Sequence, residues 1–508
     1  MPERNRPNIV LIMVDDMGFS DLGCYGSEID TPNVDSLARG GLRFTHFYNA
    51  ARCCPTRASL LTGLHPHQAG MGGMVNGDGI EGSPYQGAIN RECVTLAEVL
   101  GDAGYATYMS GKWHVGEEHP NWPMDRGFDR HYGLISGGMN YFDITKPKRP
   151  GIKRHFSMEN DEHVPQREDF YVTDAFSDYA VERIEDHDDP EQPFFLYLAY
   201  TAPHWPLHAR PEDIDKYADR YTEGWQPLRE ERYERLVEAG LIDPAWELSP
   251  PDEEAADWDA LDDDKRAEMT RKMAIYAAQI DRMDQGVGRV IDALRKKGEF
   301  ENTLILFLSD NGACHEGGPL GGDWRNGEGG KLGTVDSYES YGRSWSNASN
   351  TPFRRHKHWV HEGGIATPLI CHWPGVIESG SMTDEVGHII DFMPTFCELA
   401  DAAYPEKYHD GNDIKPMEGK SLLPVLEGGR REPHDLLHWA HEGNHAIRSG
   451  KWKLVMEDGS PWELYDMAAD RTELNDLADE RPELMQELRA KFERWAEEIG
   501  VGWTPPEQ

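Results

Sequence analysis

A cysteine, a proline and an arginine stand at fixed spacing in residues 53–63, which read Cys-Cys-Pro-Thr-Arg-Ala-Ser-Leu-Leu-Thr-Gly. Cys53 lies two residues before Pro55 and four before Arg57. Pro55 suits a first helical turn, and the apolar residues that follow, with Gly63 as a stop, predict a short buried helix. A group just ahead of a helix N-terminus meets unpaired N–H groups and the positive end of the helix dipole. The segment therefore favours a nucleophile or a bound anion, the alternative being a buried cysteine pair at a helix start.

Four apolar runs of the chain each end in polar residues. The runs and their polar ends are 9–14 with Asp15 and Asp16, 105–110 with Lys112 and His114, 194–200 with His204, and 304–308 with Asp310 and Asn311. Short continuous apolar runs indicate strands buried on both faces. Helical patterns lie between them, as at 93–103 and 276–296, so the sequence predicts an α/β fold with a mostly parallel sheet. Ligands of such sheets bind beyond the carboxyl ends of the strands, and we expect the four clusters to meet at one site.

Oxygen donors dominate two of these clusters. Asp15, Asp16, Asp310 and Asn311 offer no nitrogen or sulfur ligand, and they suit a hard divalent cation, Ca²⁺ or Mg²⁺, better than zinc. Adjacent carboxylates at a strand end would repel each other without a cation. The alternative for Asp310-Asn311-Gly312 is an ordinary turn, since these residues also favour turns.

Cationic and acid–base candidates come from three separate contexts. They are Lys112 and His114 after one strand-like run, His204 after another, and Lys357 within a basic segment at 352–364. An isolated lysine or histidine is usually solvated or satisfied by a neighbour. The proximity of each to a polar cluster favours a functional role here.

The overall composition excludes several classes of partner. The 508-residue chain carries a formal net charge of −40, which repels nucleic acid and anionic membranes. The apolar runs are too short to span a bilayer, and the N-terminus shows no signal peptide. Seven scattered cysteines form no disulfide-rich pattern and fit a reducing compartment. We therefore expect a cytoplasmic protein with no nucleic-acid or membrane partner and a solvated acidic surface.

The motifs, in this order, resemble the type I sulfatases of the alkaline phosphatase superfamily. The matching segments are Val14-Asp15-Asp16, the C-x-P-[ST]-R-x-x-x-L-T-G pattern that begins at Cys53, Gly111-Lys112-Trp113-His114, Ala202-Pro203-His204-Trp205, Ser309-Asp310-Asn311-Gly312, Lys357 with Glu362-Gly363-Gly364, 447–454 and 463–466. The resemblance covers almost the whole chain, and the Cys53 pattern is its most specific part.

The resemblance implies an alkaline-phosphatase-like large α/β domain with a mostly parallel central sheet, followed by a smaller C-terminal domain with an antiparallel sheet and a terminal helix. We expect residues 1–430 to form the catalytic domain, with an insertion at about 208–272, and residues 431–508 to form the C-terminal subdomain. The C-terminal pattern agrees independently: 446–466 favours two strands, and 482–499 an amphipathic helix.

The same resemblance implies the chemistry. A formylglycine-generating enzyme would convert Cys53 to formylglycine, whose hydrate attacks the sulfur of a small-molecule sulfate ester. Asp15, Asp16, Asp310, Asn311 and residue 53 would ligate a metal, Ca²⁺ in preference to Mg²⁺. Arg57, Lys112, His114, His204 and Lys357 would surround the sulfate. His204, with Lys357, would protonate the leaving alcohol or phenol, and His114 would take the proton of the second hydroxyl as sulfate is expelled.

Several alternatives stay open at this level. A phosphonate or phosphate ester hydrolase uses the same aldehyde machinery, although Asn311 favours sulfate. An inactive metal-binding protein is a more distant alternative. The sequence does not indicate the leaving group or the oligomeric state. The acidic insertion at 208–272 suits a lid, a subunit contact or a solvated excursion, and 321–350 suits a wall of the substrate pocket.

Overall fold

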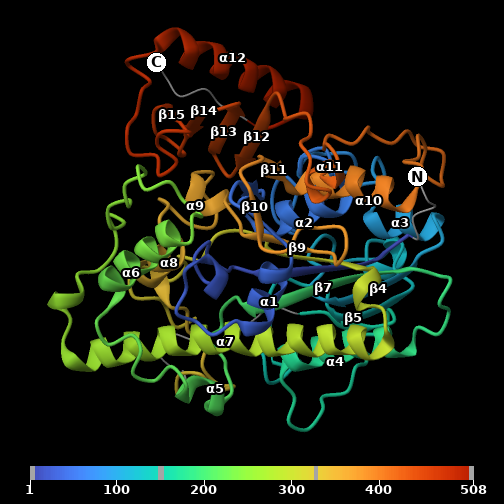
Figure 1. Ribbon diagram of the computed structural model, residues 1–508, viewed down its shortest axis with the longest axis horizontal. Helices are drawn as coiled ribbons and strands as arrows, with labels where there is room; N and C mark the ends of the chain where they lie inside the picture. The colour runs from blue at the N-terminus through green and yellow to red at the C-terminus, as the bar shows by residue number, and fades with distance from the viewer. Residues whose placement is uncertain (1–5, 147–153, 325–329, 503–508) are drawn as a thin grey trace.

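A large twisted sheet runs through the centre of the protein, as the computed structural model shows (Figure 1). The structure describes residues 6–146, 154–324 and 330–502. Nine strands form the sheet, in the order β10-β2-β9-β8-β1-β7-β4-β5-β6. Their bounds are β1 Asn8–Asp15, β2 Leu42–Phe44, β4 Ala106–Gly111, β5 Arg130–Leu134, β6 Phe156–Met158, β7 Phe194–Pro203, β8 Thr303–Ser309, β9 Leu369–His372 and β10 Ser381–Thr383.

The four strands predicted from apolar runs form the middle of this sheet. β8, β1, β7 and β4 are neighbours, and each adjacent pair is parallel. β1, β7 and β8 are buried along their entire length. Antiparallel pairs occur toward the edges, where β9 joins β2 and β8, and β6 joins β5. The mixed α/β class with a mostly parallel sheet is therefore confirmed.

Helices cover both faces of the sheet. Their bounds are α1 Pro32–Gly40, α2 Cys53–Thr62, α3 Leu96–Asp102, α4 Val172–Asp186, α5 Pro211–Asp215, α6 Trp225–Glu238, α7 Asp263–Lys297, α8 Gly342–Ser349, α9 Glu362–Ile365, α10 Phe392–Ala400, α11 Leu423–Leu426 and α12 Pro482–Ile499. Alternate side chains of β1 enter two separate cores: Val10 and Ile12 pack with α1, α4 and α7, while Ile9 and Leu11 pack with α2, α3 and α10. Figure 1 shows α7 running along one side of the molecule, beside α4. In the described part of the chain, no helix combines the length and the apolar character that crossing a membrane needs.

A second, antiparallel sheet lies at the C-terminal end, where α12 covers it (Figure 1). Its strands are β12 Leu437–His441, β13 Asn444–Ser449, β14 Trp452–Met456 and β15 Glu463–Asp466, and two short strands elsewhere, β3 Phe47–Tyr48 and β11 Gly387–His388, pair with each other. The sequence interpretation of 446–466 as two strands is corrected to three. Gly450 and Gly459, with φ of 56° and 73°, turn the chain twice within this segment.

A buried ion-pair network joins the small sheet to α9. Glu362, at the start of α9, lies 2.9 Å from Lys453 Nζ on β14 and 2.8 Å from Arg471 Nε. All three side chains are fully buried. Buried charges need such partners, because removing one of them leaves an uncompensated charge in a medium of low dielectric constant. The C-terminal match to the family pattern at 447–454 therefore includes Lys453, which attaches the small sheet to α9.

The acidic segment at 208–272 packs partly against the loop that follows β1. It contains α5, α6 and the first turns of α7. Arg232 of α6 is fully buried and pairs with Asp21 at 2.6 Å and with Glu28 at 2.9 Å. The segment thus supports the loop that follows β1. The other candidate wall, 321–350, includes α8, and residues 325–329 of it lie outside the described residues.

A buried histidine on β5 predicts acid sensitivity. His131 is fully buried, neither ring nitrogen has a hydrogen-bond partner, and burial lowers its pKa to about 3. Its neutral form stabilises the fold fully above pH 6.5, the ordinary value, and this contribution is lost as the pH falls toward 3, because only the unfolded chain takes up the proton. Between pH 6.5 and about pH 4.5, we expect the free energy of unfolding to fall by about 2–3 kcal/mol less in His131→Phe than in wild type.

Thermal unfolding followed across pH checks this expectation. The curves of wild type and His131→Phe should separate below pH 6.5, and His163→Phe, which replaces an exposed histidine, should follow wild type. Parallel curves for wild type and His131→Phe down to about pH 4 would show that the buried ring does not cause acid sensitivity.

Candidate active site

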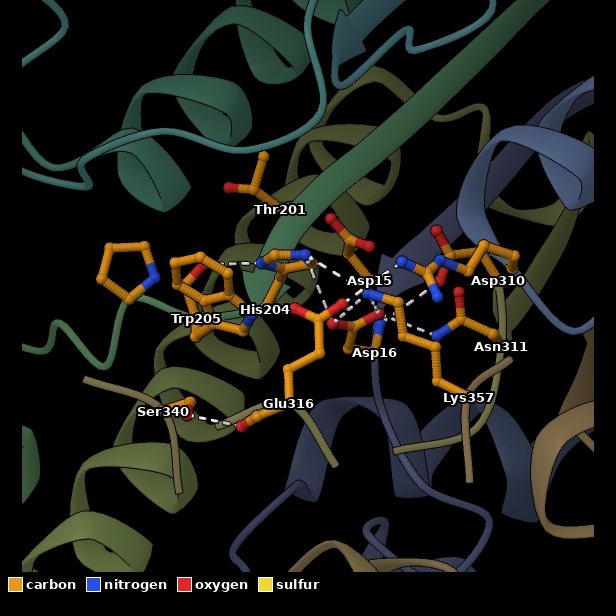
Figure 2. A network of polar contacts seen from close by, with 12 residues as sticks. Asp15, Asp16, Thr201, His204, Trp205, Asp310, Asn311, Glu316, Ser340 and Lys357 are labelled. Atoms are coloured by element: carbon orange, nitrogen blue, oxygen red, sulfur yellow. Dashed lines mark hydrogen bonds and ion pairs between the residues drawn. The ribbon is translucent and has the colours of Figure 1, made fainter. Parts of the chain in front are cut away.

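The carboxyl ends of β8, β1, β7 and β4 deliver the predicted residues to one place. Asp15 ends β1, Lys112 directly follows β4, His204 directly follows β7 and Asp310 directly follows β8. The structure also brings the remaining predicted residues to this edge, namely Asp16, Cys53, Arg57, His114, Asn311 and Lys357. Figure 2 shows His204, Asn311 and Lys357 directed toward Asp16.

Three buried carboxylates each contact a cationic side chain. The pairs are Lys112 Nζ with Asp15 Oδ2 at 2.7 Å, Lys357 Nζ with Asp16 Oδ2 at 2.9 Å, and Arg57 NH2 with Asp310 Oδ2 at 2.7 Å. The carboxylates are at most 1% exposed. The site is therefore a dry, densely charged cluster in which every charge acts at short range.

The acidic group fits a divalent cation. Asp15 Oδ1 and Asn311 Oδ1 are buried and have no hydrogen-bond partner, so two oxygens of the predicted ligand set are available to a metal. Burial raises the pKa of Asp15 to about 7 and also raises the pKa values of Asp16 and Asp310. A divalent cation would reverse this effect, because it favours the ionised carboxylates. The donors are oxygens, as Ca²⁺ and Mg²⁺ require.

Cys53 begins α2, and Arg52 is the residue that precedes the helix. Cys53 is 2% exposed. A hydrogen bond from Cys54 holds the pKa of the Cys53 thiol well below its ordinary value, and the charge of Lys112 and a hydrogen bond from His114 act in the same direction, against burial. The first turn of a helix and nearby cations both favour an anion at this position.

The turn after β4 places Lys112 and His114 beside Cys53. Gly111 has a φ of 120°, and a Cβ at this position would lie 1.9 Å from the carbonyl oxygen of Ala199 on β7. Only glycine allows this close approach, after which the Lys112 amide donates to the same carbonyl at 2.7 Å. Burial lowers the pKa of His114 to about 3, so the ring is neutral at pH 7 and can accept a proton.

His204 and Lys357 both lie beside Asp16. Lys357 Nζ lies 3.4 Å from His204 Nε2, and the same nitrogen of His204 lies 3.4 Å from Asp16 Oδ2. The Nδ1 atom of His204 contacts the carbonyl of Trp205 at 2.5 Å (Figure 2). This contact fixes the ring and leaves Nε2 facing the site. The geometry suits proton transfer at Nε2.

Sequence reasoning missed several residues that hold the site in place. Tyr141 donates from its hydroxyl to the carbonyls of Thr201 and His204, at 2.8 and 2.7 Å, and so supports the turn that carries His204. Glu316 accepts from the indole of Trp205 at 2.7 Å (Figure 2). Tyr141 and Glu316 come from loops, where no hydrophobic period or strand end marks a residue. Only the proximity of Glu316 to the Asp310 motif was a signal.

Models of protein families match nearly the whole chain. The model described as Sulfatase matches residues 7–402, and the model described as N-sulphoglucosamine sulphohydrolase, C-terminal, matches residues 354–498. The first match contains all of the site residues described above.

Individual proteins agree with the family models. An uncharacterised sulfatase of Schizosaccharomyces pombe is 35% identical over 99% of this chain and 96% of its own length. An arylsulfatase of Klebsiella aerogenes is 34% identical over 83% of this chain and 92% of its own. Among solved structures, i-CgsB in complex with a neocarrahexaose superposes with a TM-score of 0.69 and 27% identity, over 97% of this chain and 93% of that one.

Proposed function

Because this chain belongs to the sulfatase family, and is a sulfuric ester hydrolase, we propose that it cleaves sulfate monoesters with a formylglycine formed at Cys53. One observation carries the proposal: Cys53 stands at a helix N-terminus, beside Lys112 and His114 and within a ring of buried charges. Formylglycine supplies a hydrated aldehyde, whose first hydroxyl attacks sulfur and whose second permits release of sulfate. A formylglycine-generating enzyme is then the maturation partner.

Buried cations bind the sulfuryl group in this proposal. Lys112 and Lys357 are at most 2% exposed and lie on two sides of the carboxylates. Positive groups that are already in place stabilise the charge that develops on the sulfuryl oxygens, without reorganisation during the reaction. Arg57, held by Asp310 and by the carbonyl of Lys112 at 3.0 Å, keeps positive charge beside residue 53.

Two histidines divide the proton transfers. His204 Nε2 faces the site beside Lys357, so this pair donates the proton to the departing oxygen. His114 is neutral because of burial and accepts a proton from residue 53 on the other side. A built-in acid is needed for basic leaving groups such as alcohols and sugars. We therefore propose that the natural substrate is a small sulfate ester of an alcohol, a sugar or an unactivated phenol.

Asp15, Asp16, Asp310, Asn311 and residue 53 are the proposed metal ligands, with Ca²⁺ favoured over Mg²⁺. The unpartnered oxygens of Asp15 and Asn311 support this assignment. When bound, the ion supplies Lewis acidity to the sulfate oxygens and to residue 53. The carboxylates hold the ion, and Lys112 and Lys357 each keep one carboxylate oriented.

A comparison of matched substrates tests the function. Protein coexpressed with a formylglycine-generating enzyme is assayed with a nitrophenyl sulfate and a nitrophenyl phosphonate ester of the same leaving group. We expect kcat/KM for the sulfate to be higher. A higher value for the phosphonate ester would assign the chain to the second candidate, a phosphonate or phosphate ester hydrolase, which uses the same residues.

Metal binding predicts a measurable gain in stability. After chelation, Ca²⁺ at about 100 times its Kd should stabilise the fold by about 2.7 kcal/mol, because only the folded chain assembles the ligands. Asp310→Asn should lose most of the increase in Tm, since it removes one ligand charge. Asp284→Asn replaces a buried acid that caps α1 outside the site and should keep the increase. A wild-type Tm that responds to neither Ca²⁺ nor Mg²⁺ would contradict the proposed site.

A further inference from the structure

A second group of side chains at the edge of the active site has the arrangement of metal ligands. His358, His441 and Glu442 offer ligand atoms that all lie within 4.8 Å of one another. In the described part of the chain, the other groups of this kind consist of residues at the active site itself. We call this group the rim triad. It shares no residue with the carboxylate cluster and does not include Cys53.

The rim triad joins the C-terminal sheet to the large domain. His441 ends β12, and Glu442 and Gly443 form the two-residue turn into β13, with φ of 44° and 85°. Positive φ at both positions is typical of the tight hairpin turns that follow the twist of the strands. His358 belongs to the large domain and follows Lys357 in the sequence. Its amide donates to the carbonyl of Ala51 at 2.8 Å. The triad therefore lies beside the segment that leads into Cys53.

The distances within the rim triad fit a small transition-metal ion. His358 Nδ1 lies 2.9 Å from Glu442 Oε2, and His441 Nε2 lies 3.8 Å from Glu442 Oε1. In a tetrahedral zinc site, bonds of about 2.0–2.2 Å place the ligand atoms about 3.4 Å apart. The two observed distances bracket this value, so small rotations of exposed Glu442 would bring its oxygens into range.

His441 provides an independent observation. Its side chain is 1% exposed, and neither of its ring nitrogens has a hydrogen-bond partner. A buried polar atom without a partner is costly and uncommon. The neighbouring Glu442 carboxylate is 3.8 Å away, too far for a hydrogen bond. A metal ion between them would give the buried imidazole the partner that it lacks.

We propose that His358, His441 and Glu442 bind one transition-metal ion, Zn²⁺ in preference to Ca²⁺, at the rim of the active site and separately from the oxygen-ligand site. Two imidazoles and one carboxylate suit zinc, whereas calcium requires oxygen ligands. The side chain of Glu442 is 46% exposed, so the ion can enter from solvent. Three protein ligands leave one coordination position for water or another small ligand.

Arg52 is the group that opposes this ion. Its guanidinium NH1 lies 3.4 Å from His358 Nδ1, the atom that would bind the metal. The same guanidinium already pairs with Glu316 at 3.3 Å, so a shift toward Glu316 would free Nδ1 without leaving Arg52 unpaired. Binding of the ion would thus move a charged residue adjacent to Cys53 and hold the β12–β13 hairpin against the large domain.

Zinc titration of the full-length, converted protein tests the proposal. Calorimetry in saturating Ca²⁺ keeps the oxygen-ligand site filled, and we expect one Zn²⁺ per chain. Loss of a direct ligand should weaken binding by about tenfold or more in both His441→Ala and Glu442→Gln. His409→Ala, which replaces an exposed histidine far from the triad in sequence, should bind zinc as wild type does. With Cu²⁺ as the probe, electron paramagnetic resonance should show two coupled nitrogens in wild type and one in His441→Ala.

Glu442→Gln decides the result if His441→Ala does not fold, because Glu442 lies at an exposed turn. No zinc binding in saturating Ca²⁺, or equal affinity in wild type and Glu442→Gln, would overturn the proposal. If wild type binds no zinc and Glu442→Gln nevertheless changes KM, the proposal is also overturned, because the triad would then contact substrate directly. The zinc-binding measurements do not depend on sulfatase turnover, so failure of the zinc site leaves the proposed function intact.

Discussion

Replacing Cys53 by alanine is expected to abolish turnover, whereas replacing Cys54 by alanine should leave kcat within about tenfold of wild type. The two cysteines are adjacent and both are buried, so the pair is a matched comparison. A hydrogen bond from Cys54 and the charge of Lys112 hold the pKa of Cys53 well below its ordinary value, whereas burial raises the pKa of Cys54 well above its own. We therefore expect Cys53, and not Cys54, to be the nucleophile.

Mass spectrometry gives this prediction a readout that does not depend on activity. Conversion of a thiol to an aldehyde lowers the mass of the peptide containing residue 53 by about 18 Da, and the change should disappear in Cys53→Ala and persist in Cys54→Ala. Protein made without a formylglycine-generating enzyme should be inactive and lack the mass change. Wild-type kcat in Cys53→Ala would show that another residue attacks the ester.

The position of the active site was predictable because it follows from strand ends. Asp15, Lys112, His204 and Asp310 each follow an apolar run, and parallel strands bring such ends to one edge of the sheet. The buried helix at Cys53 was predictable for a similar reason, since Pro55 and Gly63 mark its first turn and its end. Both features can be predicted from the local sequence, because they depend only on which segments are buried and on the direction of the chain.

Contacts between distant loops were not predictable in the same way. Tyr141 holds His204 through backbone carbonyls, and any hydroxyl at the right place would do the same. His358 and His441 meet because the C-terminal hairpin packs on the large domain, and no spacing in the sequence reveals this. The third strand within 446–466 was missed because glycine turns divide a short segment that contains several polar residues. Long-range packing determines all three features.

The role assigned to His204 depends on which oxygen it faces. Its Nδ1 is held by the carbonyl of Trp205, and its Nε2 faces Asp16 and Lys357. A ring that donates a proton to the departing oxygen matters only when that oxygen is basic. Nitrophenolate leaves readily as an anion, whereas the alkoxide of a sugar or an alkyl alcohol does not. The leaving group itself therefore serves as the internal control.

We expect His204→Ala to lower kcat/KM for alkyl or sugar sulfates by about 10²–10⁴-fold, the usual size of general acid catalysis, and to have a much smaller effect on nitrophenyl sulfate. Kinetics with a series of phenyl sulfates of graded leaving-group pKa measure this difference, because the variant should show a steeper dependence on that pKa than wild type. His114→Ala should leave the slope unchanged, since His114 contacts Cys53 and is assigned the second proton transfer. An equal loss for every leaving group would show that His204 positions the sulfate and does not donate the proton. The graded series therefore separates an acid from a binding residue within a single variant.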